Sequence, residues 1–226
     1  MQTSGGEAGP DALARLWPLF GLRIVAGDLE LRVVRDEDLP ALVALAQEGV
    51  HPPEEMPFST PWTDGPPEQL PMVVAGYHWR VRADTSPEHW RLETVVRHCG
   101  EVVGTQGVST SDFLVTRTGE TGSWLGRRFQ GRGIGTRMRQ TLCAFCFDHL
   151  GFTEITSGAF VDNPASLAVS RKVGYRADGE VRMRRRPGEP ALNRRFVLTP
   201  DALVRHGDPL RVEGVDAVRA FLGIDG

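Results

Sequence analysis

A glycine-rich turn is the part of this sequence best suited to chemistry. It reads Gln130-Gly131-Arg132-Gly133-Ile134-Gly135-Thr136 and stands between a predicted strand and a predicted helix. Glycines carry no side chain, so backbone N–H groups there can approach a ligand closely. The first N–H groups of a helix have no partner within it and bind anions, phosphate above all. The turn is therefore predicted to hold a phosphate or pyrophosphate; the alternative is a helix start that merely turns tightly.

Neither of the two commonest phosphate-binding motifs fits this turn. A P-loop ends in Gly-Lys followed by Ser or Thr, whereas the only lysine of the chain, Lys172, lies far downstream. The dinucleotide motif Gly-x-Gly-x-x-Gly would need its third glycine one residue after Gly135. The turn is thus predicted to serve another phosphate ligand.

A second segment with a distinctive pattern runs from Asp162 to Tyr175. Together the two segments resemble the GNAT superfamily of acyl-coenzyme A-dependent N-acyltransferases. Its pyrophosphate-binding signature, Gln/Arg-x-x-Gly-x-Gly/Ala, is matched by Gln130, Gly133 and Gly135. Its later signature, Asn-x-x-Ser and a helix ending in Lys-Leu-Gly-Phe/Tyr, is matched by Asn163, Ser166 and Lys172–Tyr175. The stretch Glu120–Leu125 resembles the strand before the turn in the RimJ/RimL branch, which acylates protein N-terminal amines. The resemblance covers about 29–198 and is specific over 120–175.

The resemblance implies where the acyl-CoA would lie. It would occupy the gap between two splayed parallel strands, here about 119–126 and 153–161, with its pantetheine arm paired to the backbone like an added strand. Asn163 and Ser166 would face it from the other side. The cofactor-binding residues implied are Trp124, Leu125, Gln130, Gly131, Arg132, Gly133, Ile134, Gly135, Thr136, Asn163 and Ser166. Acetyl-CoA is the expected donor, succinyl-CoA is the alternative, and no metal is expected.

The reaction implied is direct attack of an amine on the thioester in a ternary complex. An alkyl ammonium group has a pKa of ~10.4 and must first lose a proton, so a base or a water chain is expected. Glu120 stands where many relatives carry a catalytic glutamate; the alternative is a solvated strand residue, and Asp112 and Glu101 are weaker candidates. Many members use a tyrosine to protonate the leaving thiolate, but Ser170 stands at that position here. Ser166 or Ser170 could hydrogen-bond the sulfur, whereas Tyr175 is expected in the core.

A proline-rich loop over 51–71 is the predicted acceptor side of the site. It contains seven prolines, and long loops inside compact domains often serve function. Aromatic rings can hold an ammonium group, and Glu54, Glu55, Asp64 and Glu68 make the loop acidic. The alternative is that its rings only anchor the loop to the core. The substrate-binding residues expected are His51, Phe58, Trp62 and, from a following helix, Trp79.

The periodicity of apolar residues predicts the elements that position these groups. Strands are expected over 29–35, 90–98, 101–109, 119–127, 153–161, 175–186 and 191–198. Helices are expected after Asp38, over 68–83, from the glycine-rich turn to about 149, over 164–173, and as two short helices in 200–226. This order indicates a mixed α/β (α+β) domain. The resemblance implies the GNAT fold: a central, mostly antiparallel sheet of about seven strands with a splayed parallel pair, flanked by helices. Residues 1–27 form a lead-in, 28–199 the acyltransferase domain and 200–226 a helical tail packed on it.

Composition limits which cellular compartment and which classes of partner are expected. The formal net charge of -3 offers no basic field for nucleic acid or an anionic membrane. Three cysteines, no signal-peptide pattern and no apolar run of the ~20 residues that cross a membrane predict a cytoplasmic protein. Cys143-x-x-Cys146 is interpreted as buried packing rather than a redox or zinc pair. The expected partner is a small-molecule or protein amine, and a homodimer is left open.

Two other functions compete with the N-acyltransferase. One is a non-catalytic acyl-CoA-binding sensor, which the serine at position 170 favours. The other is an RNA-binding module built on a basic hairpin. A solvated face is the simpler interpretation of that hairpin. We expect the hairpin on the far side of the acceptor loop or near the acyl end. Its arginines are Arg182, Arg184, Arg185, Arg186, Arg194 and Arg195.

Overall fold

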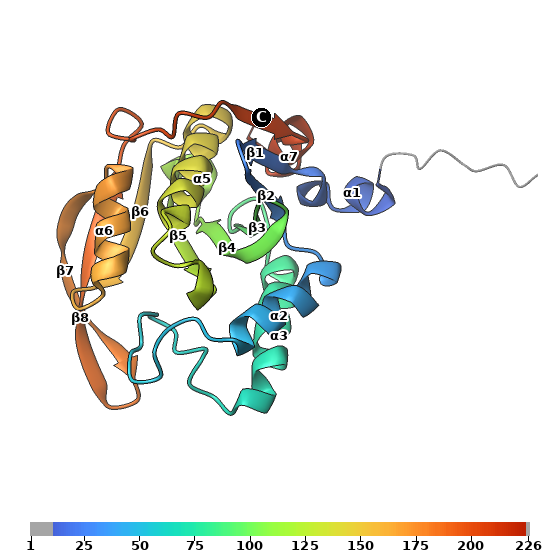
Figure 1. The fold of residues 1–226 in the computed structure, drawn as a ribbon. Coiled ribbons are helices and arrows are strands. Elements are labelled where there is room, and N and C mark those ends of the chain that lie inside the picture. The colour runs from blue at the N-terminus through green and yellow to red at the C-terminus, as the bar shows by residue number, and fades with distance from the viewer. Residues whose placement is uncertain (1–10, 225–226) are drawn as a thin grey trace, which may run out of the picture.

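The computed structural model describes residues 11–224 as one mixed sheet flanked by helices (Figure 1). The strands are β1 (Arg23–Ala26), β2 (Leu29–Val33), β3 (Arg91–His98), β4 (Glu101–Ser109), β5 (Thr118–Leu125), β6 (Glu154–Phe160), β7 (Arg176–Arg186), β8 (Glu189–Leu198) and β9 (Leu210–Glu213). The helices are α1 (Ala12–Leu16), α2 (Leu39–Gln47), α3 (Leu70–Ala83), α4 (Phe113–Thr116), α5 (Ile134–Leu150), α6 (Pro164–Val173) and α7 (Val215–Phe221). The expected fold class and the main elements from 29 to 198 are confirmed.

The sheet has the order β7-β8-β6-β5-β4-β3-β2-β1-β9. Neighbouring strands are antiparallel except β5 and β6, which run parallel. The β3–β4 hairpin turns at Cys99 and Gly100, whose φ angles of 51° and 83° suit a tight two-residue turn. The parallel pair therefore lies inside a sheet that is otherwise built from antiparallel neighbours.

Two hydrophobic cores lie on opposite faces of this sheet. The larger one joins α5 to the strands and includes Met138, Leu142 and Phe145. The smaller one lies beneath α2 and α3 and includes Val74 of α3 and Val95 of β3. Because alternate strand residues face opposite sides, the central strands β3 and β4 present one row of side chains to the α5 core and another to the core beneath α2 and α3.

The sheet has nine strands rather than about seven, and the two additional ones form an edge. β1 comes from the segment expected as a lead-in, and it pairs with both β2 and β9. The tail over 200–226 was expected to hold two short helices; over residues 200–224 the structure has one α-helix, α7, and the strand β9, so that expectation is wrong. Leu210 and Val212 alternate with polar residues, and the unpaired edge of β1 gives such a segment a strand to join.

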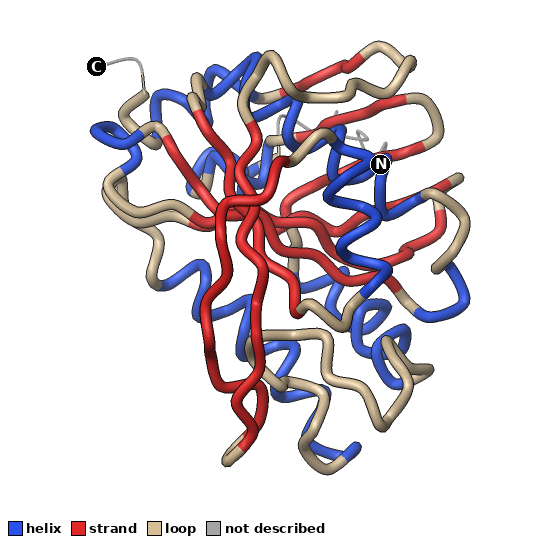
Figure 2. The backbone as a smooth tube through the Cα atoms, turned by 90° about the vertical axis from the view of Figure 1, so that its left-hand side faces the viewer, coloured by secondary structure: helices blue, strands red, loops and turns tan. Residues whose placement is uncertain are grey.

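A long hairpin made of β7 and β8 extends past the other strands (Figure 2). Its tip reaches the loop that joins α2 to α3, where Arg186 Nε lies 2.7 Å from Asp64 Oδ2. Within residues 11–224, no helix is both long and apolar enough to cross a membrane.

Candidate functional site

The two parallel strands separate soon after they meet. The ladder joins Thr118–Glu120 of β5 to Glu154–Thr156 of β6 and goes no further. β5 continues to Leu125 and stays paired with β4 on its other side. Apart from the Leu125 carbonyl, which accepts a hydrogen bond from Gln130 Nε2 at 2.9 Å, the backbone of residues 121–125 that faces away from β4 is therefore available to an extended ligand, as in strand addition.

The glycine-rich turn opens helix α5 beside this gap. Gly131 and Gly133 have φ angles of 75° and 80°, which side-chain-bearing residues rarely adopt. A Cβ added at either glycine would meet no atom within 4 Å, so backbone geometry, not crowding, requires these glycines. Turns of this kind aim successive N–H groups at an anion. The Gln130 side chain fixes the turn by donating to the carbonyls of Val50 and Leu125, at 2.7 and 2.9 Å.

Arg139, which the sequence analysis missed, links β5 and β6, the two arms of the gap, from the side of the sheet that α5 covers. Its side chain is 5% exposed. The guanidinium donates to Ser123 Oγ of β5 at 2.7 Å, to Ser157 Oγ of β6 at 3.0 Å and to Gln106 Oε1 of β4 at 3.3 Å. In the described chain, no carboxylate is among its hydrogen-bond partners. The four-residue spacing from Gly135 places Arg139 on the face of α5 that points at the gap.

The second signature builds the start of helix α6. Asn163 is the N-cap, and its Oδ1 accepts a hydrogen bond from the Ser166 N–H at 3.0 Å. Ser166 is half-buried. Ser170 is fully buried, and its Oγ has no hydrogen-bond partner among the described residues. Of the two serines expected near the sulfur, only Ser166 is therefore accessible from outside the fold.

Three of the four predicted acceptor residues form a chain of rings that ends at β5. Ring centroids lie 5.6 Å apart for His51 and Phe58, 5.3 Å for Phe58 and Trp62, and 5.6 Å for Trp62 and Trp124. Trp79 is not among these ring pairs; its indole N–H donates to Asp36 at 3.1 Å. The loop thus reaches the arm of the gap on which Trp124 lies.

His51 joins the start of this loop to Thr63 in its second half. Its Nδ1 lies 2.7 Å from the Pro52 carbonyl, which can only accept, so Nδ1 carries the proton. Its Nε2 lies 2.7 Å from Thr63 Oγ1, which can donate to it. Both ring nitrogens are therefore engaged by the protein.

The basic hairpin is largely neutralised by ion pairs. Arg185 pairs with Asp162 and stacks over the Phe160 ring at 4.2 Å, while Arg194 and Arg195 pair with Glu180 and Asp178. Because Asp64 attracts Arg186, the hairpin tip lies against the acceptor loop, so the first of its two expected positions, on the far side of that loop, is wrong. These pairs favour an ion-paired surface over an RNA-binding one.

The three carboxylates predicted as bases differ in their surroundings. Glu120 ends the parallel ladder on β5 and is exposed. Glu101 pairs with Arg128 at 2.8 Å. Asp112 precedes α4 in a left-handed conformation, with φ at 50°. Glu120 is the one of the three that lies on an arm of the gap.

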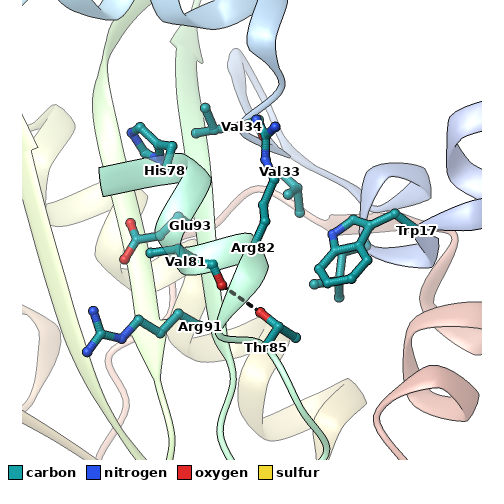
Figure 3. Close-up of a pocket in the computed structure, with 10 residues that line it drawn as sticks. Trp17, Val33, Val34, His78, Val81, Arg82, Thr85, Arg91 and Glu93 are labelled. Atoms are coloured by element: carbon teal, nitrogen blue, oxygen red, sulfur yellow. Dashed lines mark hydrogen bonds between the residues drawn. The ribbon is translucent and has the colours of Figure 1, made fainter. Parts of the chain in front are cut away.

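Glu93 on β3 is a carboxyl group that the sequence did not single out. The Tyr77 hydroxyl of α3 donates to its Oε1 at 2.6 Å. Figure 3 shows Glu93 and Arg91 side by side on their strand, next to the helix that carries His78 and Val81. Burial raises the pKa of Glu93 to about 7, although Tyr77 and Arg91 act in the opposite direction. Burial also lowers the pKa of His78 to about 4, so that imidazole is neutral at physiological pH.

The remaining chemical candidates belong to the core or the surface. Cys143 and Cys146 are both fully buried, and burial raises the pKa of Cys143 to about 11. Tyr175 is buried as expected, with its hydroxyl 2.9 Å from Thr121 Oγ1. Asp28, His98 and Cys99 lie close enough to share a cation, but Arg137 already pairs with Asp28 and its charge would oppose one.

Comparison with known proteins agrees with this geometry. Residues 28–176 match the family described as acetyltransferase (GNAT) domain. YdaF of Bacillus subtilis (strain 168), provisionally named a ribosomal N-acetyltransferase, is 32% identical over 91 residues, which is 40% of this chain and 49% of YdaF. The chain therefore spans about half the length of this curated relative.

Solved structures share the fold. Mycobacterium smegmatis RimJ, in complex with CoA-disulfide, is 21% identical with a TM-score of 0.66 and covers 90% of this chain and 95% of its own. RimL, named a ribosomal L7/L12 alpha-N-protein acetyltransferase and solved with coenzyme A, is 21% identical with a TM-score of 0.61, over 79% and 97%. At this level of identity, the two structures show that the chain shares their fold. The family match covers about two thirds of this chain and includes the turn at the start of α5. The chain therefore belongs to the GNAT acetyltransferase family.

Proposed function

We propose that this chain is an acyl-CoA-dependent N-acyltransferase that transfers an acetyl group to a primary amine. The observation that carries the proposal is the early separation of β5 from β6, directly beside the glycine turn that opens α5. An extended thioester fits such an arrangement because its arm can pair with a free strand edge while its pyrophosphate meets free N–H groups. RimL and RimJ were solved with coenzyme A or its disulfide. A further solved structure of this fold, the microcin C7 self-immunity acetyltransferase MccE, contains acetyl-CoA, which favours acetyl-CoA over succinyl-CoA.

In this proposal, the backbone N–H groups of the glycine-rich turn hold the pyrophosphate. The Gln130 side chain fixes the start of that turn. The pantetheine arm pairs near Trp124 and Leu125. Ser166, the accessible serine of α6, donates a hydrogen bond to the leaving sulfur. Since a thiol has a pKa of ~8.5, the thiolate is a tolerable leaving group and needs little further help. The residues assigned to the turn are Gly131, Arg132, Gly133, Ile134, Gly135 and Thr136.

The acceptor is assigned to the side covered by the proline-rich loop. The rings of Phe58 and Trp62 lead from the loop to Trp124, and aromatic faces attract an ammonium group. Glu54 and Glu55 are exposed there. The names of YdaF and RimL point to ribosomal proteins as acceptors of those relatives, so a protein N-terminal amine is the acceptor we place first, ahead of a small-molecule amine.

Thiol release tests this function. The chain, acetyl-CoA and a panel of peptides and small amines should give acceptor-dependent release of free CoA, with a matching mass increase of the acceptor. Succinyl-CoA in place of acetyl-CoA should give slower release. Tight CoA binding without release for any acceptor would instead support the non-catalytic sensor.

Replacing Trp62 by alanine is expected to raise the acceptor KM about 2- to 30-fold, the worth of one cation–π contact. The acetyl-CoA Kd should change little. Trp79→Ala should have a smaller effect, because that indole is bonded to Asp36. Steady-state kinetics with both substrates varied would measure this. A weaker acetyl-CoA affinity with unchanged acceptor KM would place the loop on the cofactor side.

A further inference from the structure

The carboxyl group of Glu93 lies on a floor made of two glycines. In the sheet register, Glu93 pairs with Gly107 of β4, which pairs with Gly122 of β5. A Cβ on Gly107 would stand 2.5 Å from Cδ of Glu93, so the carboxyl group lies directly over that glycine. A Cβ on Gly122 would meet no atom within 4 Å. The next position beyond the carboxyl group is therefore bare.

This bare position adjoins the gap between β5 and β6. Adjacent strands are about 4.8 Å apart, so the carboxyl group over Gly107 stands roughly one strand spacing from the bare face of Gly122. Gly122 lies two residues past Glu120, where the ladder to β6 ends. An amine seated on Gly122 would thus lie between the Glu93 carboxyl group and a ligand in the gap.

Side chains on the same face of the sheet bound the glycine floor. Two residues toward the open end, Trp124 faces the same side as Gly122 and packs on the Val95 core. In the opposite direction the neighbouring row contains Arg91, Ser109 and Glu120, in register across three strands. Trp124 also ends the chain of rings from the acceptor loop. The floor therefore lies at the inner end of the side assigned to the acceptor.

We propose that Glu93 is the general base of the transfer and that the glycine floor seats the acceptor nitrogen. The inference rests on the proposed function. The Glu93 carboxylate takes one proton from the ammonium group, directly or through one water. The freed lone pair attacks the thioester carbonyl, the C–N bond forms, the C–S bond breaks, and the thiolate receives the second proton that the nitrogen loses. The third proton stays on the amide, and Glu93 returns its proton to solvent.

The surroundings of Glu93 suit a group that exchanges a proton near neutrality. From α3, the Tyr77 hydroxyl donates to it, while neutral His78 and the Arg82 guanidinium line the same small cavity. From its own strand, Arg91 adds a positive charge. β4 and β5 present only glycine at this position. Burial outweighs the effects of Tyr77 and Arg91 and raises the pKa of Glu93 to about 7, the range in which a base works best at physiological pH.

The test compares two conservative variants with controls in the full chain. Glu93→Gln should lower kcat about 10²- to 10⁴-fold at pH 7, the usual worth of a general base, and its rate should recover as pH approaches the pKa of the amine. Glu120→Gln removes the carboxylate that the family resemblance points to, and its loss should be tenfold or less. Glu37→Gln removes an exposed charge outside the site and should leave the rate unchanged.

Two further variants separate a base from a structural residue. Tyr77→Phe removes a hydrogen bond that favours the charged carboxylate, so the acidic limb of the kcat/KM profile should move to higher pH. Gly107→Ala leaves Glu93 in place but pushes its carboxyl group aside, so it should lower kcat with little change in acetyl-CoA Kd. Difference infrared titration of wild type against Glu93→Gln should show one carboxyl group protonating near neutrality, with no need for turnover.

The outcomes distinguish this inference from the function on which it rests. A large loss in Glu120→Gln with near-normal turnover in Glu93→Gln would assign the base to Glu120 and overturn the inference. An unmoved acidic limb in Tyr77→Phe would do the same. If wild type acetylates no amine although it binds acetyl-CoA, the proposed function fails and the base assignment fails with it.

Discussion

Aspartate at Gly133 is expected to weaken coenzyme A binding about 100-fold, whereas asparagine at the same position is expected to weaken it only a fewfold. A carboxylate about 5–6 Å from a phosphate costs ~3 kcal/mol at an effective dielectric constant of 20. The Cβ direction at Gly133 is open, so either side chain would extend into the space assigned to the pyrophosphate. Calorimetric titration with CoA would measure both affinities.

The asparagine variant isolates the effect of charge. Residue 133 has a φ of 80°, and Asn and Asp tolerate the left-handed region better than other side chains do. The two variants therefore share nearly the same strain and shape, and thermal unfolding should place them close together. Their difference in affinity should shrink as salt increases, because screening weakens the repulsion. Equal affinities would show that the pyrophosphate lies elsewhere.

The cofactor side of the site could be predicted from sequence because its determinants are local. Gln130, Gly133 and Gly135 lie within six residues, and the left-handed conformation of Gly133 is one that glycine adopts readily. Asn163 likewise indicates a helix start from its local sequence, and in the structure it is the N-cap of α6. Apolar periodicity predicted the elements between 29 and 198 for a similar reason.

The base candidate on β3 could not be found in this way. Glu93 alone looks like any glutamate on a strand, and Gly107 and Gly122 look like two unrelated glycines. Only the register of three strands places them in one row, and register between strands is a tertiary property. Likewise, β1 and β9 are far apart in the sequence but pair in the sheet, and segments of only four residues are too short for their pattern to predict a strand.

Arg139 carries a buried charge whose hydrogen-bond partners suit a guanidinium group better than an ammonium group. Its three hydrogen-bond acceptors are on three different strands, and each is neutral. A guanidinium group can serve them together because its donors are fixed in a planar fork, whereas an ammonium group is a compact point charge. Lysine at this position would keep a buried charge and lose part of its solvation by the protein.

Replacing Arg139 by lysine is therefore expected to lower the free energy of unfolding by about 2–4 kcal/mol at pH 7, as an incompletely paired buried charge does. Arg139→Met removes the charge and retains most of the volume, so its loss should be smaller, about 1–2 kcal/mol from the acceptors left without donors. Arg137→Lys on the same helix is the matched control. Arg137 is half-buried and ion-paired to Asp28 and Asp208, so that change should cost less than about 1 kcal/mol.

The pH dependence of the lysine variant provides the sharper check. A poorly solvated buried lysine has a pKa below its unfolded value of ~10.4, so between these two values the unfolded chain binds more protons than the folded one. Stability then rises with pH across that range. Arginine stays charged throughout, so the difference in the free energy of unfolding between wild type and Arg139→Lys should decrease as pH rises from 7 to about 10. Denaturant unfolding at several pH values would measure this difference. A constant difference would mean that the lysine finds hydrogen-bond partners as good as those of the guanidinium, and that the link between β5 and β6 does not require an arginine.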